Sequence, residues 1–380
     1  MESSRIKVFW QAVSVMMGTI IGAGIMGIPY VVAKVGLLPG LSILLVLGLA
    51  VMLVHLMIAE MMLRTRERHQ IPGLINRYLG KIYKFIDAAG IIFGAYGALT
   101  AYIIGEGQVW ATLLGDQSRP WLYSGLFVLI GVLVLFFGLK LVKLIDEWLL
   151  ALVVIIIVVI AVLCWPAVNP INYQTVNWSN SFIGYGVLLF ALSGTNAIFS
   201  VREVLKNREK MIKPAIITGS LLPMFLYALF AVAVVGVTGS ATTEIATIGL
   251  GSALGSRMII LCNLFAAITM FTSFCAIGLS LKQMYYHDYG LPAWLAWILV
   301  ISVPPIIFFL VSPDFIKVIG LAGAVTFGLS GVLIVAAYWR SKKHGDKSPA
   351  FSLPKFYSIG GLIILMFVLG IIYSLVTWKA

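Results

Sequence analysis

Apolar stretches of about 20 residues recur along the whole chain, and short polar segments separate them. This is the length that an α-helix needs to cross the hydrocarbon core of a bilayer. The chain lacks the alternating ten-residue pattern of a membrane β-barrel. We therefore predict an α-helical bundle of eleven spans, numbered 1 to 11 in chain order. The spans cover residues 8–33, 41–62, 86–106, 121–139, 147–166, 182–201, 215–238, 258–281, 292–311, 318–338 and 357–377.

The composition supports a membrane protein. Apolar residues make up 61% of the 380 residues and charged residues 11%, against about 45–50% and about 25% in soluble domains. The segments between the predicted spans are too short for a separate soluble catalytic domain. The three cysteines have neither the even number of a disulfide framework nor the spacing of a metal site. Any function must therefore reside among the spans.

The basic residues indicate how the spans are oriented. The chain has 26 Lys and Arg against 14 Asp and Glu. If the N-terminus is cytoplasmic, nearly all basic residues fall on the cytoplasmic side, as the positive-inside rule requires. The exceptions are Lys34, Arg119, Arg257, Lys317 and Lys379. We predict a multi-pass protein of the cytoplasmic membrane, with its C-terminus extracellular. The basic excess then faces lipid headgroups and indicates neither a nucleic-acid partner nor an obligate protein partner.

Two spans carry residues that resist a regular helix at mid-membrane depth. Span 1 has four glycines and a proline within residues 18–29, and span 6 has the polar run Ser-Gly-Thr-Asn at 193–196. Within a helix, glycine costs about 1 kcal/mol relative to alanine, and proline about 3 kcal/mol. Spans 1 and 6 begin two five-span halves, residues 1–166 and 167–338, which leave a basic loop and span 11 in 339–380. Because five is odd, the halves run in opposite directions, and broken helices at matching positions of such an inverted repeat indicate a transporter's binding site.

An unwound segment inside a membrane exposes peptide groups that can bind a charged solute. N–H groups at the start of a half-helix attract a carboxylate, and freed carbonyl groups attract an ammonium group or a metal cation. An amino acid zwitterion satisfies both. The alternative for span 1 is that Gly18 and Gly22 form only a small-residue packing face between helices. The second break, in span 6, favours the binding site.

The run Gly-Ala-Gly-Ile-Met-Gly-Ile-Pro-Tyr at 22–30, followed by Gly36, resembles the first-span signature of the amino acid permeases of the amino acid/polyamine/organocation superfamily. The amino acid/auxin and aromatic amino acid permease branches are the most similar. Further similar stretches are Ala59-Glu60, Ala101-Tyr102-Ile103 with Gly105, residues 190–198 with Leu205-Lys206, and Thr272-Ser273-Phe274 with Leu279 and Leu281. The resemblance covers most of the chain. It implies an all-α integral membrane protein with the LeuT-type five-plus-five inverted repeat, spans 1 and 6 broken, plus one extra helix.

The resemblance also implies where an amino acid binds. The N–H groups of Ala23 and Gly24 would hold its carboxylate, and Ile20 with the carbonyls of Phe190 and Ala191 would lie near its amine. Tyr96 and Thr100 would face the substrate, or else serve ordinary helix packing. After the span 6 glycine, relatives often have an aromatic residue where this chain has threonine, which leaves the pocket size open. The full implied set is Thr19, Ile20, Gly22, Ala23, Gly24, Tyr96, Thr100, Phe190, Ala191, Ser193, Gly194 and Asn196.

The energy source must be an ion gradient or exchange, because the chain has no phosphate-binding GxxxxGK[ST] loop. In related folds a sodium site is made of span 1 carbonyls and span 8 hydroxyls. Here it would use Gly18, Ile21, Thr269, Thr272 and Ser273. Oxygen ligands suit a hard cation. The alternative is that the hydroxyls bond to their own helix backbone. No cofactor other than this possible sodium ion is expected.

Proton coupling would need a titratable group within the membrane. His55 lies near mid-membrane in span 2, and Glu60 lies near the end of that span with Arg64 at i+4 as a partner. Asp87 and Glu106 are expected near the ends of span 3, where headgroup water is available. Some relatives place a lysine in span 5, and this chain has none there.

Together these features predict a secondary active transporter that moves an amino acid by alternating access, by sodium or proton symport. The other interpretation is an amino-acid-sensing receptor subunit of the same fold without net transport. An intramembrane enzyme would need a paired nucleophile and base or a metal triad, and the four histidines fall in different segments. We therefore expect no enzymatic activity.

Overall fold

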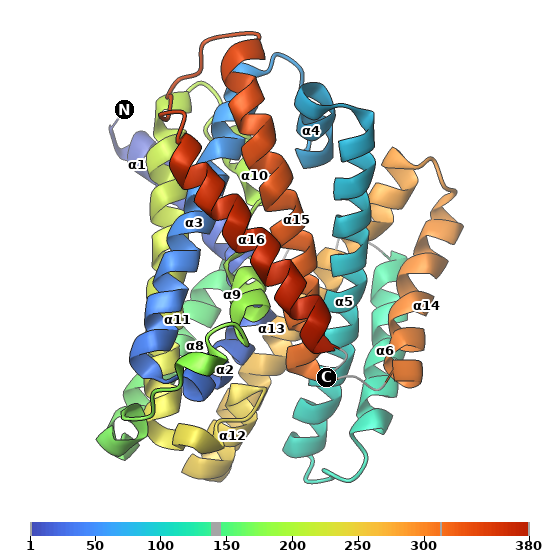
Figure 1. Ribbon diagram of the computed structural model, residues 1–380. Helices are drawn as coiled ribbons and strands as arrows, with labels where there is room; N and C mark the ends of the chain where they lie inside the picture. The colour runs from blue at the N-terminus through green and yellow to red at the C-terminus, as the bar shows by residue number, and fades with distance from the viewer. Residues whose placement is uncertain (1, 138–145, 312–313, 379–380) are drawn as a thin grey trace.

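The computed structural model describes residues 2–137, 146–311 and 314–378, and all regular secondary structure in this part of the chain is helical (Figure 1). The α-helices are α1 (Glu2–Ile20), α2 (Ile28–Val35), α3 (Leu37–Arg64), α4 (Ile71–Leu79), α5 (Lys81–Leu113), α6 (Pro120–Phe137), α8 (Asp146–Cys164), α9 (Tyr185–Leu192), α10 (Ala197–Val204), α11 (Ile212–Thr238), α12 (Ala246–Leu254), α13 (Ser256–Gln283), α14 (Ala293–Val311), α15 (Phe315–His344) and α16 (Tyr357–Trp378). A 3₁₀ turn, η1 (Ala23–Gly27), joins α1 to α2, and a π-helical turn, η7 (Met284–Asp288), follows α13.

Each predicted apolar run coincides with one of these helices or with a broken pair. In the described chain, nine helices are long and apolar enough to cross a membrane, or ten if the bent pair of α1 and α2 is one span. Helix α6 is also apolar, but its stretch Pro120–Phe136 is shorter than the others. The protein is therefore a multi-span helical membrane protein, and the count of eleven spans stays a prediction.

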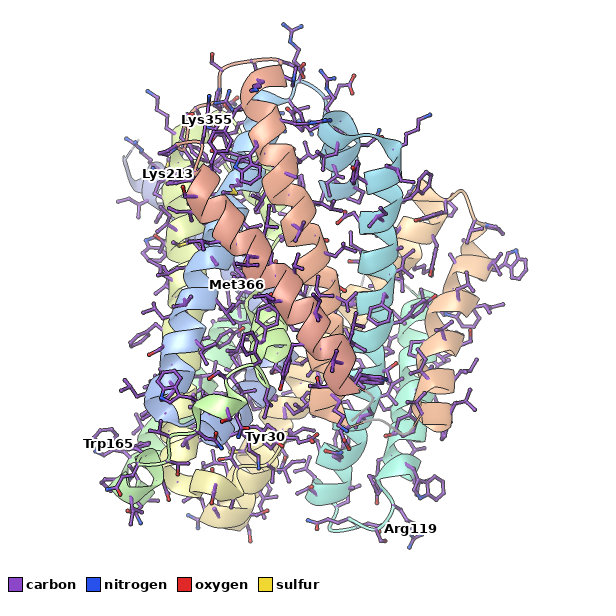
Figure 2. The ribbon with its side chains drawn as sticks, viewed as in Figure 1. Tyr30, Arg119, Trp165, Lys213, Lys355 and Met366 are labelled. Carbon is purple, nitrogen blue, oxygen red and sulfur yellow. The ribbon has the colours of Figure 1, made fainter. Side chains whose placement is uncertain are left out.

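The helices form one bundle whose two ends differ in charge. The N-terminus of α1, helix α4 and the C-terminal ends of α3 and α15 lie at the top in Figure 1, and α12 lies at the bottom. Lys213 and Lys355 are at the top in Figure 2, while Tyr30, Arg119 and Trp165 are at the bottom. We call the top the basic end, because Arg64, Arg77, Arg340 and Lys342 gather there. The charge asymmetry of the sequence thus corresponds to the two ends of the bundle.

Helix α15 is the centre of the bundle. It packs against α5, α9 and α16, and 67% of its most apolar window is buried, compared with 17% for α14 and 22% for α16. The outer helices keep large apolar side chains exposed, among them Leu310 and Leu362. Lipid solvates such side chains in a membrane, so their exposure carries no penalty there.

Close approach of backbones fixes α9 on α15. A Cβ atom at Gly323 of α15 would collide with the carbonyl oxygen of Gly186 of α9. Only glycine permits this approach. Because α9 is the first half of a broken span, this contact also fixes the position of the break that follows it.

The variant Gly323→Ala should destabilise the protein by about 1–3 kcal/mol, the usual cost of overpacking a core. Gly361→Ala on α16 is the matched control, because a Cβ atom there meets nothing within 4 Å. Thermal unfolding in detergent should show a lower midpoint for Gly323→Ala and no loss for Gly361→Ala. Equal midpoints for the two variants would contradict the packing described here.

Candidate substrate site at two helix breaks

The first break lies between α1 and α2, at the position that the glycine pattern predicts. Helix α1 ends at Ile20, Gly22 is extended with φ −135° and ψ −162°, and the chain resumes through η1 into α2. The axes on the two sides differ by 54°. Pro29 stands in the first turn of α2, where its missing N–H costs nothing. The sequence therefore unwinds span 1 at its glycines and restarts it at its proline.

The second break separates α9 from α10. Helix α9 ends at Leu192, Ser193 is extended with φ −72° and ψ 127°, and α10 begins at Ala197. The two short helices still form one apolar stretch, Tyr185–Val204. Both predicted breaks are therefore present.

The two breaks touch each other in the middle of the bundle. A Cβ atom at Gly24 would lie 2.7 Å from the Cα of Ala191, and one at Gly194 would lie 2.5 Å from the Ile20 side chain. Gly24 thus allows backbone-to-backbone contact at this junction, and Gly194 allows the Ile20 side chain to pack on the second break. Four residues predicted to bind substrate, from segments about 170 positions apart in the sequence, meet here.

A tyrosine that the sequence analysis did not select connects the breaks. The Tyr227 hydroxyl on α11 donates to the carbonyl oxygens of Ile20 at 2.7 Å and Ala191 at 3.0 Å. Tyr227 is fully buried. These carbonyls lie in the last turns of α1 and α9, where the helix has no further N–H to offer them. The signal in the sequence was a tyrosine inside an apolar run, since a buried tyrosine hydroxyl requires a partner.

Helix α13 contacts the span 1 break through Ser273. The Ala23 N–H donates to Ser273 Oγ at 3.4 Å, and a Cβ atom at Gly22 would lie 3.0 Å from the same oxygen. Tyr102 of α5 is buried near the Ser273 side chain. Its ring also packs edge-on against Phe190, with centroids 6.5 Å apart. Tyr102 thus belongs to the site, although sequence analysis selected Tyr96 and Thr100 on the same helix.

His55 of α3 contacts the span 6 break. The Gly194 N–H donates to His55 Nε2 at 3.2 Å, and His55 Nδ1 lies 3.4 Å from Ser220 Oγ. Because Nε2 accepts a hydrogen bond, it carries no proton here, and Nδ1 carries the ring proton of the neutral imidazole. Peptide groups of both breaks are therefore held by His55, Tyr227 and Ser273, from three different helices.

Other residues predicted to bind substrate lie elsewhere. The Tyr96 hydroxyl is 2.8 Å from that of Tyr285 in η7 and donates to the Leu299 carbonyl, while Thr100 donates to the Tyr96 and Pro304 carbonyls. Both therefore pack towards α14 and η7. The Thr19 hydroxyl donates to the Val15 carbonyl of its own helix. Thr19 and Asn196 are exposed on the protein surface, whereas Ser193 is half-buried.

The two threonines proposed for sodium are hydrogen-bonded to their own helix backbone. Thr269 donates to the Phe265 carbonyl at 2.7 Å, and Thr272 donates to the Ile268 and Thr269 carbonyls at 2.9 and 3.1 Å. Gly18 faces outward, and a Cβ atom there would meet only Leu150 of α8. Among these candidates, Ser273 contacts the span 1 break directly. The bonding of the threonines corresponds to the alternative in which they serve their own helix.

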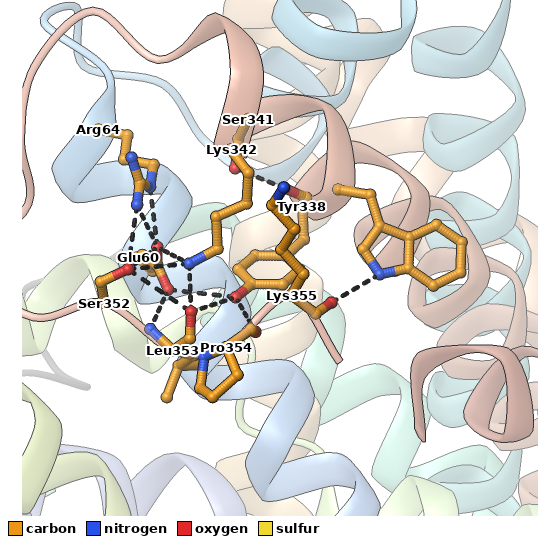
Figure 3. A network of polar contacts seen from close by, with 10 residues as sticks. Glu60, Arg64, Tyr338, Ser341, Lys342, Ser352, Leu353, Pro354 and Lys355 are labelled. Atoms are coloured by element: carbon orange, nitrogen blue, oxygen red, sulfur yellow. Dashed lines mark hydrogen bonds and ion pairs between the residues drawn. The ribbon is translucent and has the colours of Figure 1, made fainter. Parts of the chain in front are cut away.

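Glu60 lies in a dense polar network at the basic end (Figure 3). Its carboxylate pairs with Arg64 at 2.8 Å and with Lys342 at 2.5 Å, and it accepts from the Leu353 N–H at 2.7 Å. Tyr338 and Ser352 also donate to it. Two cations and three further donors surround this buried carboxylate. Glu60 thereby joins the end of α3 to α15 and to the segment that precedes α16.

Asp346 extends this linkage outside the membrane-spanning helices. The Arg66 N–H and the Arg77 guanidinium donate to its carboxylate at 3.1 and 2.8 Å. These hydrogen bonds hold the pKa of Asp346 below its ordinary value. The bond from the Arg66 backbone has the largest effect, and the bond from the Arg77 side chain has the next largest. Since its folded-state pKa is depressed, its contribution to stability is complete above the ordinary pKa of aspartate and is lost as the pH falls through the lowered value.

The two acidic residues of α5 are buried within the bundle, which corrects the expectation that headgroup water is available to Asp87 and Glu106. Their side chains are 0% and 1% exposed. Asp87 Oδ1 accepts from Ser330 at 2.5 Å, and Glu106 Oε2 accepts from Trp110 at 3.0 Å. Span 3 is longer than predicted, 33 residues as α5, so both positions lie well inside the helix. A position near the end of an apolar run therefore did not predict the burial of these two residues.

A multi-span helical bundle in which two broken helices meet defines a class of membrane protein, the transporters that bind solutes at discontinuous helices. Comparison with known proteins then gives the family. The chain belongs to the tryptophan/tyrosine permease family, whose model matches residues 5–377. This confirms the resemblance to amino acid permeases and to their aromatic branch. The family is one of transporters, not of enzymes.

Relatives match over nearly the full chain. Tyrosine-specific transport system 1 of Haemophilus influenzae is 26% identical over 94% of this chain and 93% of its own length. Glutamine transporter 2 of Aliivibrio fischeri is 22% identical over 94% and 95%. The crystal structure of MhsT in complex with L-phenylalanine aligns with a TM-score of 0.67 over 97% of both chains at 14% identity. That structural match shows that the fold is LeuT-type.

Replacing Glu60 by glutamine should destabilise the protein by about 3–5 kcal/mol, because it leaves the buried cations without their counter-charge. Glu203→Gln is the control, since Glu203 pairs with Arg68 in a pair whose side chains are 53% and 68% exposed and such pairs contribute about 0–1 kcal/mol. Denaturant unfolding in detergent measures both. Similar losses in the two variants would show that the Glu60 network contributes no more than a surface pair.

Proposed function

We propose that this protein is a secondary active transporter that moves an aromatic amino acid, tyrosine or tryptophan, across the cytoplasmic membrane by alternating access. The observation that carries the proposal is the contact between the two breaks, where carbonyls from two helix C-termini and N–H groups at a restarting helix come together. Family membership supports an amino acid as the substrate. The tyrosine-specific relative and the phenylalanine complex of MhsT support an aromatic one.

The breaks would bind the charged groups of the substrate. The Ala23 and Gly24 N–H groups bind the carboxylate, and the carbonyls of Ile20, Phe190 and Ala191, with the Ser193 hydroxyl, bind the ammonium group. Gly22 and Gly194 leave room for the side chains of Ser273 and Ile20 beside the breaks. Thr19 and Asn196 flank the two breaks. Helix C-termini favour cations and N-termini favour anions, so one zwitterion complements the junction.

The aromatic side chain of the substrate would lie among rings that already surround the span 6 break. Phe190 contacts Tyr102 with centroids 6.5 Å apart and Phe327 with centroids 6.2 Å apart, both edge-on. Aromatic rings gain about 0.5–1.5 kcal/mol from such contacts beyond simple burial. Tyr102 and Phe327 therefore replace Tyr96 and Thr100 in our assignment of the side-chain pocket.

The membrane arrangement belongs to the same proposal. Eleven spans would form two inverted five-span repeats, residues 1–166 and 167–338, followed by span 11 in residues 339–380. The basic end would face the cytoplasm, because positively charged segments are retained there. Spans 1 and 6 would then move relative to the helices that surround them.

A proton gradient would drive transport through His55. His55 contacts the span 6 break directly, whereas Thr269 and Thr272 of the sodium set bond to their own helix. A proton on Nε2 would remove the acceptor of the Gly194 N–H and so release the break. Glu60, already paired with two cations, serves in this scheme as an anchor at the basic end.

Purified protein in proteoliposomes should accumulate labelled tyrosine or tryptophan against its gradient when the lumen is alkaline. Gly24→Leu should abolish binding and uptake, because the side chain has no room beside Ala191. Gly361→Leu, at an open surface position, is the control. Saturable binding without accumulation would instead indicate a sensor, and unchanged uptake by a folded Gly24→Leu protein would overturn the site.

His55→Gln should flatten the pH dependence of uptake measured between about pH 5 and 8, because it removes the ring that would carry the coupling proton. His69→Gln is the control, since His69 lies outside the spans and pairs with Glu67. Initial rates measured across this range, with sodium and with choline, test the coupling. An unaltered pH profile in His55→Gln would exclude His55 as the proton site, and a strict sodium requirement of the wild type would favour the Gly18, Ile21, Thr269, Thr272 and Ser273 set.

A further inference from the structure

The Tyr227 hydroxyl lies where carbonyl groups from the C-terminal ends of two helices converge. Ile20 closes α1, and Ala191 lies in the last turn of α9. The hydroxyl lies 2.7 Å from the first carbonyl oxygen and 3.0 Å from the second. Each helix end carries partial negative charge. The junction therefore offers an electronegative site, and the neutral side chain of Tyr227 fills it.

One hydroxyl cannot fully satisfy this site. It has a single proton to donate, so the two carbonyls must share it. An ammonium group offers three donors and a positive charge, and hydrogen bonds from charged donors are about twice as strong as neutral ones. A cation at this position would therefore bind both carbonyls better than Tyr227 does.

We infer that the Tyr227 hydroxyl occupies the position of the substrate's ammonium group and is displaced by it. Before binding, the hydroxyl is hydrogen-bonded to the Ile20 and Ala191 carbonyls. On binding, the substrate amine replaces it there. The inference rests on the proposed function and names the group that the amine must displace. Tyr227 is a positioning residue in this account, because it holds the breaks together without being part of the bound state.

Displacement would link binding to movement of α11. This helix packs against α1, α2 and α3, so it contacts both halves of broken span 1 and the helix that carries His55. When the amine binds the Ile20 and Ala191 carbonyls, the Tyr227 hydroxyl loses these two acceptors. The hydrogen bonds that join α11 to the breaks are then broken. Binding of the amine thus frees α11 from the junction.

The variant Tyr227→Phe tests the inference, because it removes the hydroxyl and preserves the ring. The ligand-free variant should unfold at a lower temperature, since two buried carbonyls lose their donor. Its affinity for tyrosine should rise about three- to tenfold, because the amine no longer competes with the hydroxyl. Its affinity for 3-(4-hydroxyphenyl)propionate, which is tyrosine without the amine, should stay within about twofold. Binding is measured by competition with labelled tyrosine in choline buffer.

Tyr185→Phe is the matched control. The Tyr185 hydroxyl on α9 is also buried, but it has no hydrogen-bond partner among the described residues. This variant should change neither the affinity for tyrosine nor that for the analogue. A folded Tyr227→Phe protein with unchanged or weaker tyrosine binding would overturn the inference. So would equal tightening for both ligands, or tightening that occurs only when sodium replaces choline, which would assign the site to a metal ion.

Wild-type protein supplies a readout that does not depend on recovery of the variant. Tyrosine, but not the analogue without the amine, should increase hydrogen–deuterium exchange in the α11 segment around Tyr227. The same exchange pattern with both ligands would contradict displacement. Wild-type protein that binds no aromatic amino acid would instead refute the proposed function, so the two failures are distinguishable.

Discussion

The structure depends on one requirement: peptide groups freed by a helix break inside a membrane must find partners there. Water is absent from the bilayer core, and an unsatisfied backbone group costs several kcal/mol. Two spans of this protein break at matching positions, and each break leaves carbonyls and N–H groups without helical partners. Placing the breaks in contact and surrounding them with Tyr227, Ser273 and His55 satisfies many of these groups. In our proposal, the same groups bind the zwitterionic substrate.

Close packing and ion pairs hold the helices around this junction, whereas single hydrogen bonds close the junction itself. Glycine contacts fix α9 on α15, and the Glu60 network ties α3 to the end of α15. By contrast, the junction itself is closed by single hydrogen bonds from side chains. Each contributes only about 0.5–1.5 kcal/mol, which a bound amino acid can replace. A stable frame with weakly closed breaks suits alternating access.

Much of this arrangement could be predicted from the sequence, and the rest could not for a physical reason. The positions of the spans follow from long apolar runs, and the breaks follow from glycine and proline in span 1 and from the polar run in span 6. The rotation of each helix does not follow, because lipid and protein interior are both apolar and a helix that is hydrophobic all round shows no facing side. For this reason the sequence favours Tyr96 as a substrate contact, although Tyr102 lies closer to the junction of the breaks. It also does not show that Tyr227 faces this junction. The burial of Asp87 and Glu106 was missed because α5 extends beyond its apolar run.

A structure of the protein with bound tyrosine tests the central claim most directly. The account predicts the carboxylate at the Ala23 and Gly24 N–H groups and the amine at the Ile20 and Ala191 carbonyls, with the breaks still unwound. Tyrosine bound at another place, with these peptide groups still hydrogen-bonded to Tyr227 and Ser273, would contradict it.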